Sequence, residues 1–169
     1  MIEKRRSRIH GSGVYATQLI HKNKRIIHYA GEKISNQESL KRELRYIRKG
    51  HIWCFKLTAR TVIDAGVGGN VARFVNHACR PNCYIDIKNG VIWIRAARTI
   101  RKGEELTYDY NTDGEGLIKC RCRPDCQERD RRCTARVANG PYAPRGVAPQ
   151  GRERSQVAWG GRAGYAARP

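Results

Sequence analysis

Short stretches in which apolar and polar residues alternate run through residues 1–126, a pattern typical of β-strands joined by turns. The pattern predicts strands over residues 25–34, 53–57, 61–65 and 105–110. Lys102 and Gly103 form a turn signal directly before the last of them. This part of the chain is therefore expected to consist mainly of short strands.

The clearest local signal is a β-hairpin over residues 84–96. Asn89 and Gly90 form a two-residue loop of the type I′ kind, which both residues favour because they tolerate a positive φ. This loop pairs Lys88 with Val91, and the resulting register predicts one buried face. The isoleucines on that face are Ile85, Ile87, Ile92 and Ile94.

One helix is predicted over residues 36–49. Ser35 and Glu38 have the spacing of an N-terminal capping box, and Gly50 is a stop signal. Three apolar residues recur on one face of this helix, namely Leu40, Leu44 and Ile47. Several short strands and a single helix predict a β-rich α+β domain.

Length and composition limit the classes of protein. The 169 residues suit one domain of ordinary size. No apolar run reaches the eighteen or so residues that a membrane span needs, which excludes a transmembrane protein. Polar residues follow the basic N-terminus, so we expect no secretory signal.

The composition changes near Gln127. From there to the end the chain has no Leu, Ile, Phe, Met or Lys, and it holds four of the six prolines. Because such a segment can bury little apolar surface, we expect residues 134–169 to be disordered. An out-of-frame extension is the alternative explanation for this Arg/Ala/Gly-rich stretch.

The net charge of +19 is unevenly distributed. Residues 1–60 hold 15 basic and 4 acidic side chains, residues 61–126 hold 10 and 8, and residues 127–169 hold 9 and 3. The cationic ends predict an acidic partner, which could be nucleic acid, anionic lipid or an acidic protein. Solubility alone is the alternative reason for this charge.

Seven cysteines without a secretory signal favour metal binding or reduced thiols over disulfides. Cys120, Cys122 and Cys126 are close enough in sequence to bind one ion together. Zinc requires a fourth ligand, which could be a histidine or another cysteine. The cysteine candidates are Cys79, Cys83 and Cys133, the last of which would make the site purely local.

Three further segments could carry chemistry, although each alone is common in structural roles. Gly11 to Tyr15 is a glycine-flanked turn that could approach a ligand closely. Asn76 and His77 could hold a polar ligand through their donors and acceptors. Tyr108 and Tyr110 point to the same side of a strand because side chains two apart share a face.

Taken together and in this order, the segments resemble the SET-domain protein-lysine methyltransferases that have a cysteine-rich post-SET segment, most of all the small bacterial ones. The similarity runs over about residues 6–126. The matching motifs are H-G-S-G-V-Y-A at 10–16, Y-A-G-E at 29–32, V-I-D-A at 62–65, G-N-V-A-R-F-V-N-H-A-C-R-P-N-C at 69–83, G-E-E-L-T-Y-D-Y at 103–110, and the C-x-C-x3-C.

The resemblance implies a SET domain over residues 1–111, with small curved β-sheets, one inserted helix and a pseudoknot. A post-SET zinc segment would follow over residues 112–133 and a tail over residues 134–169. It further implies a protein-lysine N-methyltransferase that uses S-adenosylmethionine. The implied cofactor-binding residues are Gly11, Ser12, Gly13, Val14, Tyr15, Arg73, Phe74, Asn76 and His77, and the implied zinc ligands are Cys79, Cys120, Cys122 and Cys126.

The two tyrosines have implied catalytic roles. Tyr110 matches the tyrosine beside the departing methyl group, and Tyr108 stands where family members have Phe or Tyr. A tyrosine at the second position predicts mainly monomethylation. Trp53 stands where many members have a tyrosine near the cofactor and the substrate, so its role is open.

The expected partner is a protein that presents a lysine, with nucleic acid or an acidic partner as an addition through the basic ends. We expect a monomer without membrane contact. Cysteine usage favours the cytoplasm, and the nucleus is the alternative if the substrate is chromatin. The competing hypothesis is a non-catalytic zinc module that binds nucleic acid or protein.

Overall fold

The computed structural model describes residues 1–110, 116–118, 121–122 and 135–137. Its helices and strands in chain order are β1 (Ile2–Arg6), β2 (Ser12–Ala16), β3 (Arg25–His28), β4 (Glu32–Ser35), α1 (Asn36–Arg48), β5 (Cys54–Lys56), β6 (Thr61–Asp64), the 3-10 helix η1 (Val71–Phe74), β7 (Asn76–His77), β8 (Cys83–Lys88), β9 (Val91–Ala96), β10 (Glu105–Tyr108), β11 (Gly116–Ile118) and β12 (Ala135–Val137).

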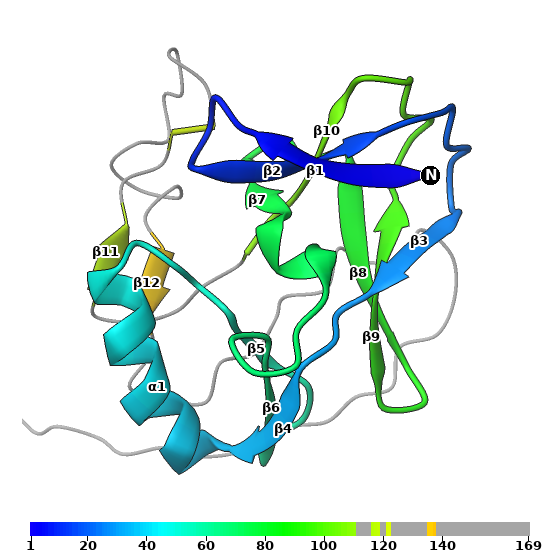
Figure 1. The fold of residues 1–169 in the computed structure, drawn as a ribbon. Helices are drawn as coiled ribbons and strands as arrows, with labels where there is room; N and C mark the ends of the chain where they lie inside the picture. Colours follow the sequence, from blue (N-terminus) through cyan, green and yellow to red (C-terminus); the bar gives the residue numbers. More distant parts are fainter. Residues whose placement is uncertain (111–115, 119–120, 123–134, 138–169) are drawn as a thin grey trace, which may run out of the picture.

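The described residues form small sheets, as Figure 1 shows. The strand orders are β1-β2-β10-β7, β3-β9-β8, β4-β6-β5 and β11-β12. With one α-helix beside them, these sheets confirm the β-rich α+β prediction. Among the described residues, no helix has the length and apolar character needed to cross a membrane.

The hairpin prediction is confirmed in its register. β8 pairs with β9 so that Lys88 faces Val91 across a turn in which Asn89 and Gly90 both have positive φ, at 52° and 70°. Ile92 and Ile94 are buried on the predicted face. Ile87 is 40% exposed, because it lies near the tip of the hairpin beyond the core.

The strand predicted over residues 25–34 is wrong as a single element. It is divided into β3 and β4, which belong to different sheets. Between them lies Gly31, where a Cβ would stand 2.4 Å from the backbone oxygen of Asp64. The chain therefore changes sheets where it passes close to another backbone. The other predicted strands are present with shorter bounds, as β5, β6 and β10.

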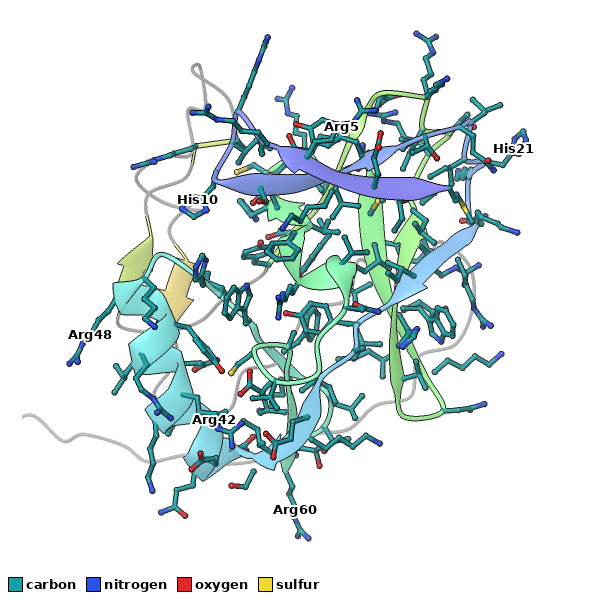
Figure 2. All side chains as sticks on the ribbon, in the orientation of Figure 1. Arg5, His10, His21, Arg42, Arg48 and Arg60 are labelled. Atoms are coloured by element: carbon teal, nitrogen blue, oxygen red, sulfur yellow. The ribbon has the colours of Figure 1, made fainter. Side chains whose placement is uncertain are left out.

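The helix α1 is confirmed, and its first turn is capped by the Ser35 hydroxyl, which accepts the Glu38 backbone N–H at 3.2 Å. Of the three apolar residues on the predicted face, Leu40 and Ile47 are half-buried, whereas Leu44 is 58% exposed. Figure 2 shows Arg42 pointing from α1 toward the β4–β6 side, whereas Arg48 points away from the protein.

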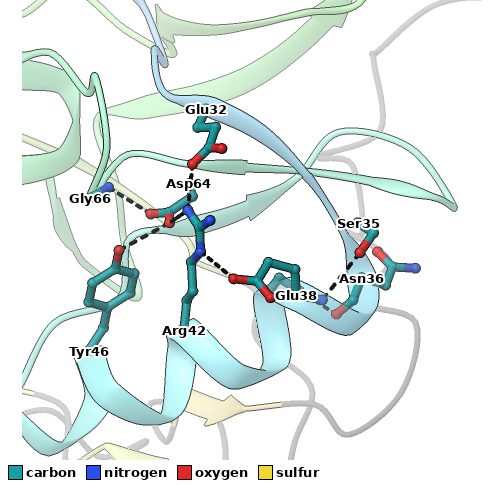
Figure 3. Close-up of polar contacts among 9 residues, drawn as sticks. Glu32, Ser35, Asn36, Glu38, Arg42, Tyr46, Asp64 and Gly66 are labelled. Atoms are coloured by element: carbon teal, nitrogen blue, oxygen red, sulfur yellow. Dashed lines mark hydrogen bonds and ion pairs between the residues drawn. The ribbon is translucent and has the colours of Figure 1, made fainter.

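The inward face of α1 is turned toward Asp64, a carboxylate with no exposed surface. Asp64 accepts hydrogen bonds from Arg42 Nη1 at 2.8 Å, Tyr46 Oη at 3.0 Å and the Gly66 N–H at 2.8 Å, as drawn in Figure 3. A buried charge requires partners, and Arg42 and Tyr46 of α1 supply two of them, which holds the helix against β6.

A parallel pairing of β7 with β10 joins two distant segments. Asn76 lies opposite Thr107, and His77 lies opposite Tyr108. β10 also pairs with β2 in antiparallel fashion, Leu106 facing Val14. These pairings bring residues near 12, 76 and 108 together at one place in the molecule. The two segments that the expected pseudoknot joins, residues 76–79 and 108–110, lie in the described part of the chain and meet through this pairing. The threading itself stays a prediction.

Candidate active site

The Glu105 carboxylate is the hub of the polar contacts where β2, β7 and β10 meet. Its Oε1 accepts hydrogen bonds from Asn76 Nδ2 at 2.8 Å and from the Ser7 hydroxyl at 2.7 Å. Its Oε2 accepts the Tyr15 hydroxyl at 2.9 Å. Glu105 therefore fixes the Asn76 side chain, whose Nδ2 also donates to the Ser12 carbonyl at 3.0 Å.

The same carboxylate explains the second glycine of the glycine-flanked turn. A Cβ on Gly13 would lie 2.2 Å from Glu105 Oε1, so a larger residue would displace the carboxylate. Gly11 has a φ of 45°, and a Cβ there would meet no atom of the described residues within 4 Å. The turn is thus packed on its Glu105 side and open at Gly11.

The other residues of the turn lie within the sheet. The Val14 side chain has no exposed surface and belongs to the core. Val14 and Tyr15 both lie between β1 and β10. Burial raises the pKa of the Tyr15 phenol, and the hydrogen bond to Glu105 raises it further.

Tyr110 is held at both its hydroxyl and its backbone. Its Oη donates to the Val75 carbonyl at 2.9 Å, and its N–H donates to His77 Nδ1 at 3.2 Å. Burial raises the pKa of the Tyr110 phenol, and the negative charge of Glu105 adds to the shift. The phenol therefore stays neutral and serves as a hydrogen-bond donor, not as a base.

His77 connects this tyrosine to a cysteine. Its Nδ1 accepts the Tyr110 N–H at 3.2 Å, and Nε2 of the same ring lies 3.4 Å from Cys79 Sγ. Asp109 Oδ1 lies 3.6 Å from Nδ1. The ring is also in edge contact with Tyr110, with centroids 5.5 Å apart.

Tyr108 and Tyr110 belong to a row of aromatic rings that continues through Phe55 to Tyr29. The ring centroids are 4.9 Å apart for Tyr108 and Tyr110, 6.0 Å for Phe55 and Tyr108, and 5.3 Å for Tyr29 and Phe55. The Tyr29 hydroxyl donates to the Trp53 carbonyl at 3.0 Å, and burial keeps its pKa well above the ordinary value. These rings form an apolar wall with few exposed atoms.

Trp53 lies between a histidine and an arginine. The His51 ring stacks on it at 4.2 Å with an interplanar angle of 7°, and the Arg73 guanidinium lies 5.1 Å from its ring centroid. Burial lowers the pKa of His51, as do the charges of His10, Lys49 and Arg73. A neutral His51 is therefore stacked on the indole.

The Arg73 guanidinium lies over the Phe74 ring, 4.9 Å from its centroid. Arg73 Nη1 donates to the Ala65 carbonyl at 3.0 Å, while its buried Nε has no hydrogen-bond partner among the described residues. Phe74 is covered by the Lys4 ammonium, 4.4 Å from its centroid, and so packs toward β1. Arg73 thus offers a buried donor that an absent acceptor could satisfy.

Two of the four implied zinc ligands lie in the described part of the chain. Cys122 Sγ stands 3.8 Å from Cys79 Sγ, which is the spacing of about 3.8 Å expected for two thiolates in a tetrahedron around zinc. Cys79 is disulfide-bonded in this structure, whereas Cys122 is not. Cys120 and Cys126 lie outside the described residues, and within those residues no three potential ligands gather into a metal site.

Sequence reasoning overlooked three residues of the site: Glu105, Tyr29 and Phe55. Glu105 and Tyr29 are part of the motifs that carried the resemblance, but neither was assigned a role. A carboxylate followed by an apolar strand residue gives no local indication of a distant amide partner. Only the pairing of β10 with both β2 and β7 reveals it.

Comparison with known proteins agrees with the resemblance to SET-domain proteins. Residues 11–111 match the SET domain family. Histone-lysine N-methyltransferase trithorax of Drosophila melanogaster is 47% identical over 124 residues, which cover 69% of this chain and 3% of that protein. The H3 lysine-4 specific histone-lysine N-methyltransferase of Emericella nidulans is 42% identical over 127 residues, which cover 69% of this chain and 10% of that protein. Histone-lysine N-methyltransferase set-2 of Caenorhabditis elegans is 42% identical over 131 residues, which cover 72% of this chain and 9% of that protein.

The chain therefore spans a tenth or less of the length of these curated relatives. All three relatives are eukaryotic, whereas the sequence favoured a similarity to small bacterial proteins. That bacterial similarity stays a prediction.

Proposed function

The chain belongs to the SET-domain family, and from this premise we propose that it is a protein-lysine N-methyltransferase that takes its methyl group from S-adenosylmethionine. The observation that carries the proposal is the parallel pairing of β7 with β10. It joins Asn76 and His77, which suit a polar cofactor, to Tyr108 and Tyr110, which suit a lysine channel.

The residues present fit the cofactor. Asn76 is held through its Nδ2 by Glu105, so its carbonyl oxygen is oriented to accept from an amino group. Within the described part of the chain, Arg73 Nε has no acceptor and could bind a carboxylate, and the space beside Gly11 leaves room for a ligand against the backbone. When bound, S-adenosylmethionine supplies the methyl group and a sulfonium charge.

The aromatic wall would prepare the lysine. A free lysine amine has a pKa of roughly 10.4, so it must lose a proton before it can attack a methyl group. Tyr29, Phe55 and Tyr108 exclude water, which disfavours the charged ammonium. Holding the amine in line with the methyl group can supply on the order of 7 kcal/mol of the barrier.

Tyr110 and Val75 would aim the methyl group. The Tyr110 phenol is neutral, and its oxygen lies 2.9 Å from the Val75 carbonyl oxygen. Two oxygens so close together can both receive weak C–H···O contacts from a methyl group between the cofactor and the amine. We propose that Tyr108 narrows the same space, which limits the reaction mainly to monomethylation.

We also propose that the reduced protein, in which Cys79 is no longer disulfide-bonded, holds a zinc ion through Cys79, Cys120, Cys122 and Cys126. The 3.8 Å separation of Cys79 and Cys122 supports this ligand set. His77, which lies 3.4 Å from Cys79 Sγ, would then link the zinc segment to the backbone of Tyr110. We propose the same boundaries as the resemblance implied, with a SET domain over residues 1–111 and the zinc segment over residues 112–133.

The relatives are named for histone-lysine methylation. We propose that this chain likewise acts on a lysine in a basic protein, with a nuclear location if that protein is histone. A bacterial basic protein in the cytoplasm is the other substrate that the sequence suggested.

The test is incubation of the full chain with methyl-labelled S-adenosylmethionine, histones and other basic proteins. Label on lysine that is lost in Tyr110→Phe and retained in Tyr84→Phe supports the proposal, since Tyr84 is a surface tyrosine bonded only to Asn23 among the described residues. Absence of both label and cofactor binding by calorimetry would overturn it in favour of a non-catalytic binding module.

A further inference from the structure

The outward face of the sheet β3-β9-β8 alternates arginines with aromatic rings. The Arg25 guanidinium lies 5.3 Å from the Trp93 ring centroid, and Arg95 lies 5.6 Å from that of Tyr84. His28 meets Trp93 edge to face across β3 and β9, with centroids 5.7 Å apart. We name these five residues the basic–aromatic face.

A rim of cations continues this face. The turn before β3 runs beside the loop after β9, since Ile20 bridges Ile100 and the Lys24 carbonyl accepts the Ala96 N–H at 3.0 Å. The two segments together contribute the rim, which consists of His21, Lys22, Lys24, Arg98, Arg101 and Lys102. Figure 2 shows His21 at the opposite end of β2 from His10, so the rim is remote from the glycine turn.

The charge of this surface is poorly compensated. Two carboxylates lie on it, and each is engaged by one arginine: Asp86 by Arg95 at 2.8 Å and Glu104 by Arg98 at 2.7 Å. The remaining cations of the surface have no ion pair within the described part of the chain: Lys22, Lys24, Arg25, Arg101 and Lys102. Such a surface attracts a polyanion.

We propose that the basic–aromatic face and its rim bind nucleic acid. Unpaired Lys and Arg side chains neutralise phosphates, and the interleaved rings provide surfaces on which bases can stack. An acidic protein segment would use the cations but would gain little from Trp93 and Tyr84. The face belongs to the sheet β3-β9-β8, whereas Asn76 lies in the sheet β1-β2-β10-β7, so this binding is additional to methyl transfer and does not depend on it.

The test compares two charge-matched variants of the full chain. One replaces Lys22, Lys24, Arg101 and Lys102 by Gln, and the control replaces the exposed cations Lys41, Arg45, Arg48 and Lys49 of the α1 region by Gln. Fluorescence anisotropy with a labelled oligonucleotide of about 20 nucleotides, single-stranded or duplex, measures the binding affinity. The salt concentration is varied from about 50 to about 200 mM, a range over which affinity that depends on phosphate contacts falls steeply.

We expect the rim variant to lose at least about tenfold in affinity and to reduce the salt slope by about 3, while the control changes little. Equal losses in the two variants would overturn the proposal, because they would show that net charge alone attracts the oligonucleotide.

A second variant separates nucleic acid from an acidic protein. Trp93→Ala should weaken single-stranded oligonucleotide binding by about fivefold or more and leave binding of a poly-glutamate peptide unchanged. Circular dichroism confirms that the variant is folded. An unchanged oligonucleotide affinity in Trp93→Ala, or poly-glutamate binding as tight as oligonucleotide binding, would refute nucleic acid as the partner.

Discussion

Asn76 Nδ2 and Glu105 Oε1 are joined by a hydrogen bond of 2.8 Å, which connects the proposed cofactor site to the strand that leads into Tyr108 and Tyr110. Since Glu105 also receives the hydroxyls of Ser7 and Tyr15, one carboxylate holds groups from three segments. A change in Glu105 should therefore alter cofactor binding before it alters the chemical step.

Glu105→Gln should weaken S-adenosylmethionine binding by about tenfold, because the amide group cannot accept from all three donors. The measurement is the cofactor Kd by calorimetry together with KM and kcat. Glu104→Gln is the matched control, since that carboxylate bonds Arg98 on the surface. The same loss in Glu104→Gln, or a fall in kcat with an unchanged Kd, would contradict the role.

Tyr108→Phe should increase the dimethyl and trimethyl products. Removal of the hydroxyl enlarges the space beside Tyr110 and admits an amine that already carries a methyl group. Mass spectrometry of a methylated peptide gives the product distribution, and Tyr84→Phe serves as the control. An unchanged distribution would remove the basis for monomethylation.

Arg42→Met should destabilise the fold by about 3–5 kcal/mol, since it leaves the Asp64 carboxylate buried without its arginine. Urea denaturation measures the free energy of unfolding, and Arg48→Met on the exposed side of α1 is the control. Combining Arg42→Met with Asp64→Asn should recover part of the loss. A double variant as unstable as the sum of the single ones would argue against a direct pair.

Glu43 makes stability depend on pH. Burial raises the pKa of its carboxyl to about 7, and the charge of Asp64 contributes to the shift. Because the folded state then binds a proton that the unfolded state has released, stability should fall as the pH rises from about 4.5 to about 7. Glu43→Gln should lessen this fall in urea denaturation at several pH values, whereas Glu38→Gln should leave it in place. A parallel pH profile for Glu43→Gln would show that the carboxyl titrates normally.

Reduced protein should bind about one zinc ion if the four proposed cysteines are its ligands. Cys122→Ser should then lower the zinc content and the melting temperature, whereas Cys83→Ser should not change the zinc content, since Cys83 is a buried core thiol. Elemental analysis and thermal denaturation measure both. An equal zinc content in wild type and Cys122→Ser would exclude Cys122 from the ligand set.

Neighbouring residues alone are enough to specify several elements of this fold. Asn89 and Gly90 specify the hairpin because they supply positive φ where the turn needs it, and Ser35 specifies the start of α1 because its hydroxyl caps the first turn. The order of the motifs also indicated the SET-domain family, which the match over residues 11–111 confirms.

How these elements meet depends on contacts between distant parts of the chain. The parallel pairing of β7 with β10, the contact of Glu105 with Asn76 and the orientation of α1 toward Asp64 each join residues far apart in the chain. The rim cations near residue 22 and those near residue 101 likewise become neighbours only on folding. Charge along the sequence does not indicate this surface, because the cations near residue 101 lie in a stretch of nearly balanced charge. Such contacts depend on which buried charges and apolar faces find partners across the whole fold, and no local spacing encodes that choice.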